Sequence, residues 1–354
     1  MSRFLDARFA GLTPYVPGEQ PRGFDYIKLN TNELPYPPAP AVAAAAEMEA
    51  RRLQLYSDPE SRELKETLAE VYGLSPQEVF VSNGSDEILS FAFMAFCGEG
   101  RGAAFPDITY GFYRVYGELY GVDCDIRPLR EDFSIDPSDY FGNDRMVVIA
   151  NPNAPTGMCL SLADIREILR HNPDVPVLID EAYVDFGGES ALALLPEYDN
   201  LLVVRTFSKS RALAGGRLGF CFGSEGLIRD LETIKFSTNP YNLDRMTQAA
   251  GIAALRDGEY FEKTVGAVIK TREETAENLR KLGARVLPSR ANFLFVSLPG
   301  IPGAQVLAAL RARGILVRHF SAPRISDFVR ITVGTPEQMD KLCAALADII
   351  NSEE

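Results

Sequence analysis

The stretch VVRTFSKSRALAGGRLGF, residues 203–220, sets one lysine, Lys209, between an apolar run and a series of small residues. A lysine that forms a Schiff base needs a tight, partly desolvated site, because a lowered pKa leaves an amine neutral and nucleophilic. A lysine taken alone is more often a solvated surface residue. Lys209 is therefore a candidate nucleophile only if other segments of the chain supply partners for it.

The segment VPVLIDEAYVDF supplies one such partner in Asp180. Asp180 ends a run so apolar that we expect a strand buried on both faces, and ligands of open α/β sheets bind beyond the carboxyl ends of such strands. A carboxylate there suits the pyridine nitrogen of pyridoxal phosphate, whose protonated ring is an electron sink. A helix cap or an ion pair is the structural alternative. Glu181 competes for the same role, and Tyr183 is near enough in the chain to reach the site.

The segment VFVSNGSDEILSFAF passes from a strand through residues 83–86 into a helix, whose first free N–H groups are a natural phosphate cradle. Turns of this kind also occur without a ligand. Ser208 and Arg217, both close to Lys209 in the chain, would add a hydroxyl and a bidentate cation to the same phosphate. Tyr110, in DITYGFY, is either a ring-stacking residue or a core aromatic.

The segment FVRITV is expected to place Arg330 on the strand face of Phe328 and Thr332. A guanidinium in that position is costly unless an anion pairs with it. The anion is either a substrate carboxylate or phosphate, or a structural glutamate. Arg318, in ILVRHF, raises the same question. The two histidines of the chain have no triad or metal spacing, so we expect no metal site.

Short apolar runs that alternate with helix-like stretches are expected to position these residues. EVFVS, GAAF, CDIRPL, MVVIAN, VPVLID, NLLVVRTF and RLGFCFG have the composition of strands. Their alternation with helices predicts an α/β fold, with a mainly parallel (mixed) sheet in a three-layer α/β/α large domain. A nearly continuous helix over 243–283 and a second set of strands predict a smaller α+β domain. We expect an arm over 1–30 that packs on the small domain or a partner subunit, a large domain over 31–245 and a small domain over 246–354.

The composition narrows the choice of partners and compartment. The 354 residues are 46% hydrophobic, which is enough for a large core. Five scattered cysteines without a CxxC pair favour a reducing cytoplasm over a disulfide framework or a zinc site. A net charge of −13 without a basic cluster argues against nucleic acid, and no apolar run approaches the roughly 18 residues of a membrane span. We therefore expect a cytoplasmic protein with small-molecule partners.

Ten segments, in order, resemble the fold-type I pyridoxal-phosphate enzymes, and specifically the histidinol-phosphate aminotransferase family. They are LTPYVPGEQP (12–21), KLNTNELPYPP (28–38), LYSDPESRELKETLA (55–69), NGSDEIL (83–89), TYGFY (109–113), NPNAPTG (151–157), DEAYVDF (180–186), RTFSKSRALAGGRLGF (205–220), ANFLFV (291–296) and VRITVGT (329–335). The resemblance implies a homodimeric aminotransferase of histidine biosynthesis, with pyridoxal 5′-phosphate as its cofactor. It also implies L-histidinol phosphate as the amino donor and a 2-oxo acid, 2-oxoglutarate, as the acceptor.

The resemblance further implies roles for particular residues. It makes Lys209 the lysine that binds the cofactor as a Schiff base, with Asp180 at the pyridine nitrogen and Tyr183 at the ring oxygen O3′. It places around the phosphate and the ring Gly84, Ser85, Asp86, Tyr110, Asn153, Ser208 and Arg217, with Tyr56 contributed by the other subunit. It places around the substrate Arg330 at a carboxylate, and Arg318 and Tyr15 at a phosphate.

One position departs from the family pattern. Where the family often has an asparagine before Pro-Thr-Gly, in contact with O3′, this chain has Ala154. The contact is either lost or made by Asn151 or Asn153. Two other activities resemble the family closely and stay open, an aromatic amino-acid aminotransferase and a threonine-phosphate decarboxylase-like lyase. Decarboxylation predicts release of carbon dioxide without a keto acid, whereas transamination predicts a pyridoxamine form that a keto acid restores.

Overall fold

The large sheet of the molecule has seven strands, in a computed structural model that describes residues 2–21, 26–98 and 100–353. In spatial order they are β2 (Val79–Asn83), β8 (Leu218–Gly223), β7 (Leu201–Thr206), β6 (Val177–Asp180), β5 (Met146–Ala150), β3 (Ala103–Pro106) and β4 (Cys124–Arg127). Strand β8 is antiparallel to both of its neighbours, and the other neighbouring pairs are parallel. Strands β5 to β8 are buried along their whole length, which explains their continuous apolar sequences. The expected α/β fold with a mainly parallel, mixed sheet is confirmed.

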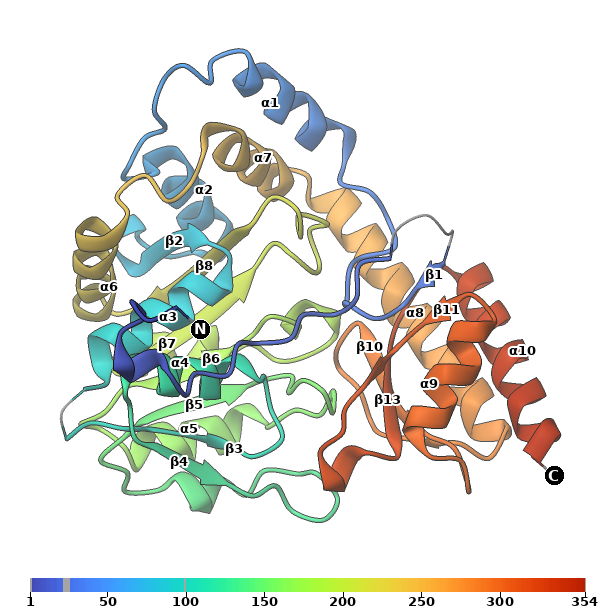
Figure 1. Cartoon of the computed structure of the whole chain (residues 1–354). Coiled ribbons are helices and arrows are strands. Elements are labelled where there is room, and N and C mark those ends of the chain that lie inside the picture. Colours follow the sequence, from blue (N-terminus) through green and yellow to red (C-terminus); the bar gives the residue numbers. More distant parts are fainter. Residues whose placement is uncertain (1, 22–25, 99, 354) are drawn as a thin grey trace.

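Helices cover both faces of this sheet, so that it is the middle of three layers (Figure 1). Val147 and Ile149 of β5 belong to the core that α2 (Arg62–Tyr72), α5 (Leu162–Arg170) and α7 (Arg245–Arg256) cover. Val148, which points to the opposite face, belongs to the core under α3 (Ser85–Phe96), α4 (Phe112–Tyr120) and α6 (Glu225–Thr238). The alternation of strand side chains thus divides one sheet between two cores.

A second, four-stranded sheet lies in the C-terminal part of the chain. Its strands, all antiparallel, follow the order β12 (Arg318–His319), β13 (Phe328–Thr332), β10 (Phe293–Ser297) and β9 (Arg285–Val286). Helices α8 (Gly258–Lys281), α9 (Gly303–Ala312) and α10 (Pro336–Glu353) contribute to its core. The helix expected over 243–283 is two helices, because Asp257 separates α7 from α8 and its carboxylate caps α8. The domain limits at 31–245 and 246–354 stay predictions.

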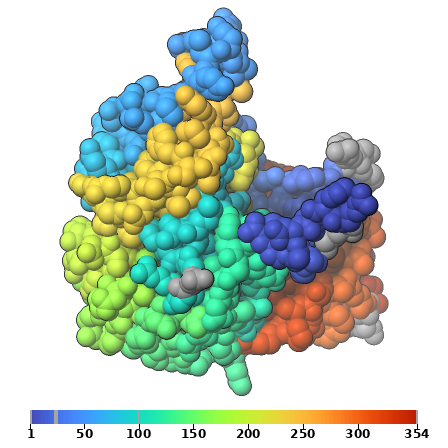
Figure 2. Space-filling model, turned by 60° about the vertical axis from the view of Figure 1, so that its left-hand side comes forward, coloured from blue at the N-terminus to red at the C-terminus, as the bar shows by residue number. Residues whose placement is uncertain are grey.

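The N-terminal segment contacts both the large-sheet part and the C-terminal part of the chain, and with the latter it forms a separate two-stranded sheet. Thr13 N–H contacts Glu118 of α4, while β1 (Ile27–Lys28) pairs in parallel with β11 (Ile315–Leu316). Figures 1 and 2 show the arm (dark blue) on the surface beside both parts. Helix α1 (Pro40–Ala50) then packs on α7. Residues 1 and 22–25 of the expected arm lie outside the described residues.

Short 3-10 helices complete the described elements. They are Ala7–Phe9, Pro76–Glu78, Pro137–Tyr140, Val184–Phe186, Ala191–Glu197 and Pro323–Ile325. In the part of the chain that the structure describes, every helix is too short or too polar to cross a membrane.

Candidate active site

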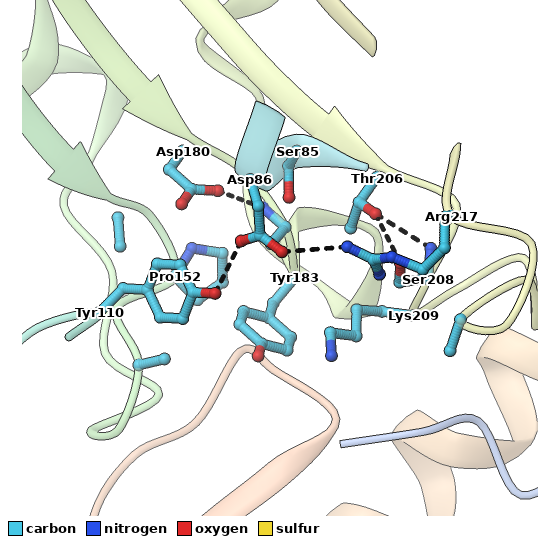
Figure 3. Close-up of a pocket in the computed structure, with 14 residues that line it drawn as sticks. Ser85, Asp86, Tyr110, Pro152, Asp180, Tyr183, Thr206, Ser208, Lys209 and Arg217 are labelled. Atoms are coloured by element: carbon cyan, nitrogen blue, oxygen red, sulfur yellow. Dashed lines mark hydrogen bonds and ion pairs between the residues drawn. The ribbon is translucent and has the colours of Figure 1, made fainter. Parts of the chain in front are cut away.

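A cavity of about 630 Å³ opens at the carboxyl ends of β5, β6 and β7. This is the edge at which parallel sheets with helices on both faces bind their ligands. The polar residues that line it come from the strand ends, from the start of α3 and from the loop after β7 (Figure 3). They are Ser85, Asp86, Tyr110, Asp180, Tyr183, Thr206, Ser208, Lys209 and Arg217. The fold therefore gathers most of the residues that the sequence singles out.

Lys209 lies in the loop after β7, with its side chain in this cavity (Figure 3). Its Nζ atom is 5.7 Å from the centre of the Tyr183 ring and donates a long hydrogen bond, 3.4 Å, to the carbonyl of Thr31. The lysine is half-buried rather than solvated on the surface. Its amine is placed where a ligand in the cavity would meet it.

Asp180 ends strand β6 and is buried in the wall of the cavity. Its two oxygens accept hydrogen bonds from the Tyr113 hydroxyl, at 2.8 Å, and from the Ala182 N–H, at 3.2 Å. Burial raises the pKa of this carboxyl to about 6, although both hydrogen bonds favour the charged form. No cation in the described chain pairs with it. A cationic ligand group beside Asp180 would offset the cost of burying its charge.

Glu181, the competing carboxylate, has a structural role instead. It is buried and ion-paired with Arg205 at 3.0 Å, and it accepts hydrogen bonds from the Ser190 hydroxyl and the Ala191 N–H. It does not line the cavity. The geometry therefore separates two adjacent acids that the sequence left as alternatives.

The far end of the cavity is formed by the turn into helix α3. Gly84 precedes the helix with φ of 77°, and a Cβ atom there would lie 2.6 Å from a guanidinium nitrogen of Arg217. Arg217 pairs with Asp86 at 3.0 Å, and the Tyr110 hydroxyl donates to the other oxygen of Asp86 at 2.7 Å. A side chain at Gly84 would displace the arginine, so the glycine keeps a cation beside the free N–H groups of a helix start.

A second cavity, of about 1040 Å³, adjoins the first. The two share Tyr110, Ala154, Tyr183 and Lys209. The wall that belongs to the second cavity alone carries Tyr15, Arg318 and Arg330, which the sequence proposes for a substrate. A molecule in the second cavity would therefore reach Lys209.

Arg330, on β13, is a half-buried cation without a carboxylate partner in the described chain. Its guanidinium lies 5.4 Å from the Phe293 ring centre and 5.7 Å from that of Phe320, and it donates to the Asn30 carbonyl at 3.2 Å. Its Nε atom is buried and has no hydrogen-bond partner among the described residues. Loss of water around it lowers the pKa of Arg330. The alternative of a structural glutamate is thus not met there, and the site is suited to an anion.

Arg318 and Tyr15 complete this wall. Arg318 donates to the carbonyls of residues 16 and 17, at 3.0 and 3.3 Å, so that it ties the arm to β12. The Tyr15 ring stacks on Phe112, with 4.4 Å between ring centres. Burial raises the pKa of Tyr15, although Arg330 and Arg318 both oppose that rise. The arm therefore supplies part of the cavity wall.

Three consecutive residues of the chain, 30–32, each contact one candidate side chain. The contacts are Asn30 O with Arg330 Nη2 at 3.2 Å, Thr31 O with Lys209 Nζ at 3.4 Å, and Asn32 Nδ2 with Tyr183 Oη at 2.9 Å. This segment follows the arm and belongs to neither sheet. All three residues line the second cavity.

Besides Gly84 and Glu181, the sequence candidates Asn151, Asn153 and Tyr56 do not line either cavity. The Asn153 side chain is engaged by Thr109, Ile108 and Thr156, and the Asn151 side chain by Leu160. Ala154 itself lines both cavities, whereas the two amides are hydrogen-bonded outside them. Tyr56 is 79% exposed and stacks on Tyr241 with 4.5 Å between ring centres.

The structure also adds residues that the sequence reasoning missed. Tyr113 holds Asp180, Thr206 shares a hydrogen bond of 2.9 Å with Ser208, and Asn32 holds Tyr183. The sequence does point toward Tyr113, which lies in the same DITYGFY segment as Tyr110, three positions later. It does not point toward Asn32, because that residue is 151 positions away from its partner.

The first cavity fits pyridoxal phosphate on the chemistry of its own residues. Lys209 offers an amine for the aldehyde, and Asp180 is a buried carboxylate that lacks a cation. The start of α3, with Gly84 and Arg217, provides donors for a phosphate. The amine, the carboxylate and the donors for a phosphate all lie at one cavity, and a single pyridoxal phosphate molecule needs all three.

Known proteins resemble this chain over nearly its full length. Residues 25–346 match the family described as aminotransferase class I and II. Histidinol-phosphate aminotransferase of Clostridium acetobutylicum is 48% identical over 351 residues, which cover 99% of this chain and 100% of that protein. The same enzyme of Aromatoleum aromaticum is 51% identical over 355 residues, again covering 99% and 100%.

Among solved structures, histidinol-phosphate aminotransferase from Sinorhizobium meliloti in complex with pyridoxal-5′-phosphate matches 100% of both chains, with a TM-score of 0.88 and 26% identity. The sequence match and the structural match thus cover the same, almost complete span, as the order of the motifs predicted. This chain belongs to the class I and II aminotransferases, and among them to the family of the histidinol-phosphate aminotransferases.

Proposed function

We propose that this protein transfers the amino group of L-histidinol phosphate to 2-oxoglutarate, with pyridoxal phosphate held covalently by Lys209. The observation that carries the proposal is Arg330. It is a half-buried cation with no carboxylate partner in the described chain, in a cavity that Lys209 also lines. The names of the relatives that are about 50% identical support the same donor.

The reaction divides the work among a few side chains. When bound, pyridoxal phosphate supplies an electron-accepting ring that takes up an amino group from one substrate and delivers it to another. The Lys209 amine would move a proton on and off the reacting carbon of the substrate. Asp180 keeps a proton on the ring nitrogen, because its buried charge needs a cation. Tyr183 donates a hydrogen bond to the ring oxygen.

The remaining cofactor contacts hold the phosphate and the ring in place. Ser208, Arg217 and the N–H groups at Ser85 and Asp86, all of which line the cavity, would hold the phosphate, and Tyr110 would pack against the ring. Tyr56 lines neither cavity of its own chain and is exposed, so that a second copy can contact it. We therefore propose a homodimer in which Tyr56 reaches the cofactor phosphate of the partner subunit.

Each substrate meets the second cavity in a different way. The carboxylate of the 2-oxo acid pairs with Arg330, whose guanidinium can form two parallel hydrogen bonds. The phosphate of the donor lies by Arg318 and Tyr15. An aromatic amino acid is the second candidate donor, because Tyr15, Tyr110 and Phe320 line the same cavity.

A panel of donors tests this proposal. The purified protein, loaded with pyridoxal phosphate, is mixed in turn with L-histidinol phosphate, phenylalanine and threonine phosphate, while visible absorbance and carbon dioxide are recorded. We expect histidinol phosphate to remove the visible band and 2-oxoglutarate to restore it, without carbon dioxide. A response to phenylalanine alone, or carbon dioxide from threonine phosphate, would overturn the proposed substrate.

A further inference from the structure

Asn32 has an uncommon backbone conformation in the wall of the second cavity, and its side chain contacts Tyr183, which lines both cavities. The φ of Asn32 is 55°, in the left-handed region that residues with a side chain rarely adopt. Three hydrogen bonds keep it there. Asn32 N–H donates to Thr332 Oγ1 at 2.9 Å, the Thr332 hydroxyl donates to Asn32 Oδ1 at 3.0 Å, and Asn292 Nδ2 donates to the Asn32 carbonyl at 2.9 Å. The side chain is buried, so its orientation is fixed by these neighbours.

These contacts determine which end of the amide meets Tyr183. A backbone N–H can only donate, so the Thr332 hydroxyl accepts from it and has its own proton left for Asn32 Oδ1. The other end of the amide, Nδ2, therefore donates to the Tyr183 hydroxyl at 2.9 Å. Any other arrangement would leave the proton of Thr332 without a partner.

The Tyr183 hydroxyl, as the acceptor in this bond, keeps its own proton free. The bond from Asn32 is the one hydrogen bond to this hydroxyl within the described residues. The rest of the Tyr183 side chain packs on the apolar residues Ala154, Ala291 and Phe293. Tyr183 lines both cavities beside Lys209 (Figure 3).

We infer that Asn32 is a positioning residue, which turns the proton of Tyr183 into the cavity so that Tyr183 can donate to a ligand oxygen. This inference rests on the proposed function, in which that oxygen belongs to the ring of pyridoxal phosphate. A donor at this oxygen favours the anionic form, so losing it raises the pKa at which the bound cofactor changes its visible absorbance. Position 154 carries no amide, and Asn151 and Asn153 are engaged elsewhere, so Asn32 is the side-chain amide that reaches Tyr183 in the described chain.

The test is a pH titration of the visible absorbance of the holoenzyme. Asn32→Gly removes the amide and tolerates the left-handed φ, and Asn32→Asp keeps the shape but replaces the donor with an acceptor. We expect each to raise the titration midpoint by about one pH unit. Tyr183→Phe should raise it by at least as much, and the double variant Asn32→Gly/Tyr183→Phe no further than Tyr183→Phe. Additive shifts, or wild-type midpoints in both Asn32 variants, would contradict the inference.

A matched control separates positioning from general loosening of the segment. Asn292→Ala removes the hydrogen bond to the Asn32 carbonyl and leaves the bond from Asn32 to Tyr183. We expect it to lower the Tm and to leave the titration midpoint unchanged. An equal shift of the midpoint in Asn292→Ala would mean that Asn32 acts only through segment rigidity. If the wild-type protein forms no visible band with pyridoxal phosphate, the proposed function fails, and the inference with it.

Discussion

The two adjoining cavities differ in how completely their buried polar atoms are hydrogen-bonded. In the first, Asp86 pairs with Arg217 and Asp180 accepts from Tyr113. These residues come from one continuous sheet and its helices. In the second, Arg330 Nε is buried and without a hydrogen-bond partner in the described residues, and so is Oδ1 of Asn30.

From this difference we infer that the two cavities bind different kinds of ligand. Buried polar atoms without partners are uncommon in folded proteins and cost free energy, so they persist where a ligand supplies the missing bond. We propose that the first cavity holds one permanent group, the cofactor, and that an acid substrate supplies the contacts that the second cavity lacks. Changes in the first should therefore affect every substrate, and changes in the second should affect one substrate at a time.

The largest effect is expected from Asp180→Asn. The substitution keeps the shape and removes the charge that holds a proton on the ring nitrogen, so kcat should fall about 10³-fold with either substrate varied. Steady-state kinetics of the holoenzyme measure it. Glu181→Gln is the matched control, because Glu181 lies outside the cavity and is ion-paired with Arg205. We expect it to lower the Tm and to change kcat much less than Asp180→Asn does. An Asp180→Asn enzyme within tenfold of wild type would remove the distinction between the two acids.

The burial of Asp180 also predicts that the free energy of unfolding of the cofactor-free protein depends on pH. The folded-state pKa of Asp180, about 6, lies above its ordinary value of 3.8, so the folded state binds the proton more tightly. Asp180 therefore contributes stability at low pH that is lost as the pH rises from about 4 to above 6, about 3 kcal/mol in all. Unfolding by urea at several pH values, with Asp180→Asn as the reference, measures this. A difference between the two proteins that is independent of pH would contradict the burial of an unpaired carboxylate.

Arg330→Lys tests the second cavity separately from the first. A lysine keeps the charge but loses the two parallel hydrogen bonds, so KM for 2-oxoglutarate should rise about 10²-fold. The visible absorbance of the holoenzyme should not change, because Arg330 does not line the first cavity. A changed absorbance with an unchanged KM would show that the two cavities are not divided as we propose.

Arg318→Gln is expected to have the smallest effect. Arg318 is partly exposed and hydrogen-bonded to the arm, so KM for histidinol phosphate should rise only about tenfold. KM for 2-oxoglutarate should stay near that of wild type. Initial rates at fixed concentrations of the second substrate distinguish the two. An equal rise in both values would place Arg318 in arm packing alone.

The same contrast explains how much could be predicted from sequence. Site residues at strand ends can be predicted from the sequence. A run such as VPVLID predicts a buried strand, and its last residue, Asp180, then lies at the binding edge of the sheet. The local sequence does not decide between Asp180 and Glu181, because adjacent residues share the same pattern and differ only in their distant partners. The break at Asp257 was missed because two helices that share an apolar pattern look like one.

Contacts between distant segments could not be predicted in this way. Asn32 and Thr332 are 300 positions apart, and nothing in either local sequence indicates the other. The amide of Asn153 likewise hydrogen-bonds to Thr109 and Ile108, which are 44 and 45 positions away in the chain. Many segments that are far apart in the sequence line the second cavity, among them the arm, residues 30–32 and residues 318–330, and no local pattern indicates that they meet.

The most direct test of the central claim is to reduce the holoenzyme with borohydride and to map the peptides by mass. We predict a pyridoxyl phosphate adduct on the peptide that contains Lys209, and no adduct when histidinol phosphate is added before reduction. An adduct on another lysine, or one at Lys209 that histidinol phosphate does not remove, would contradict the account.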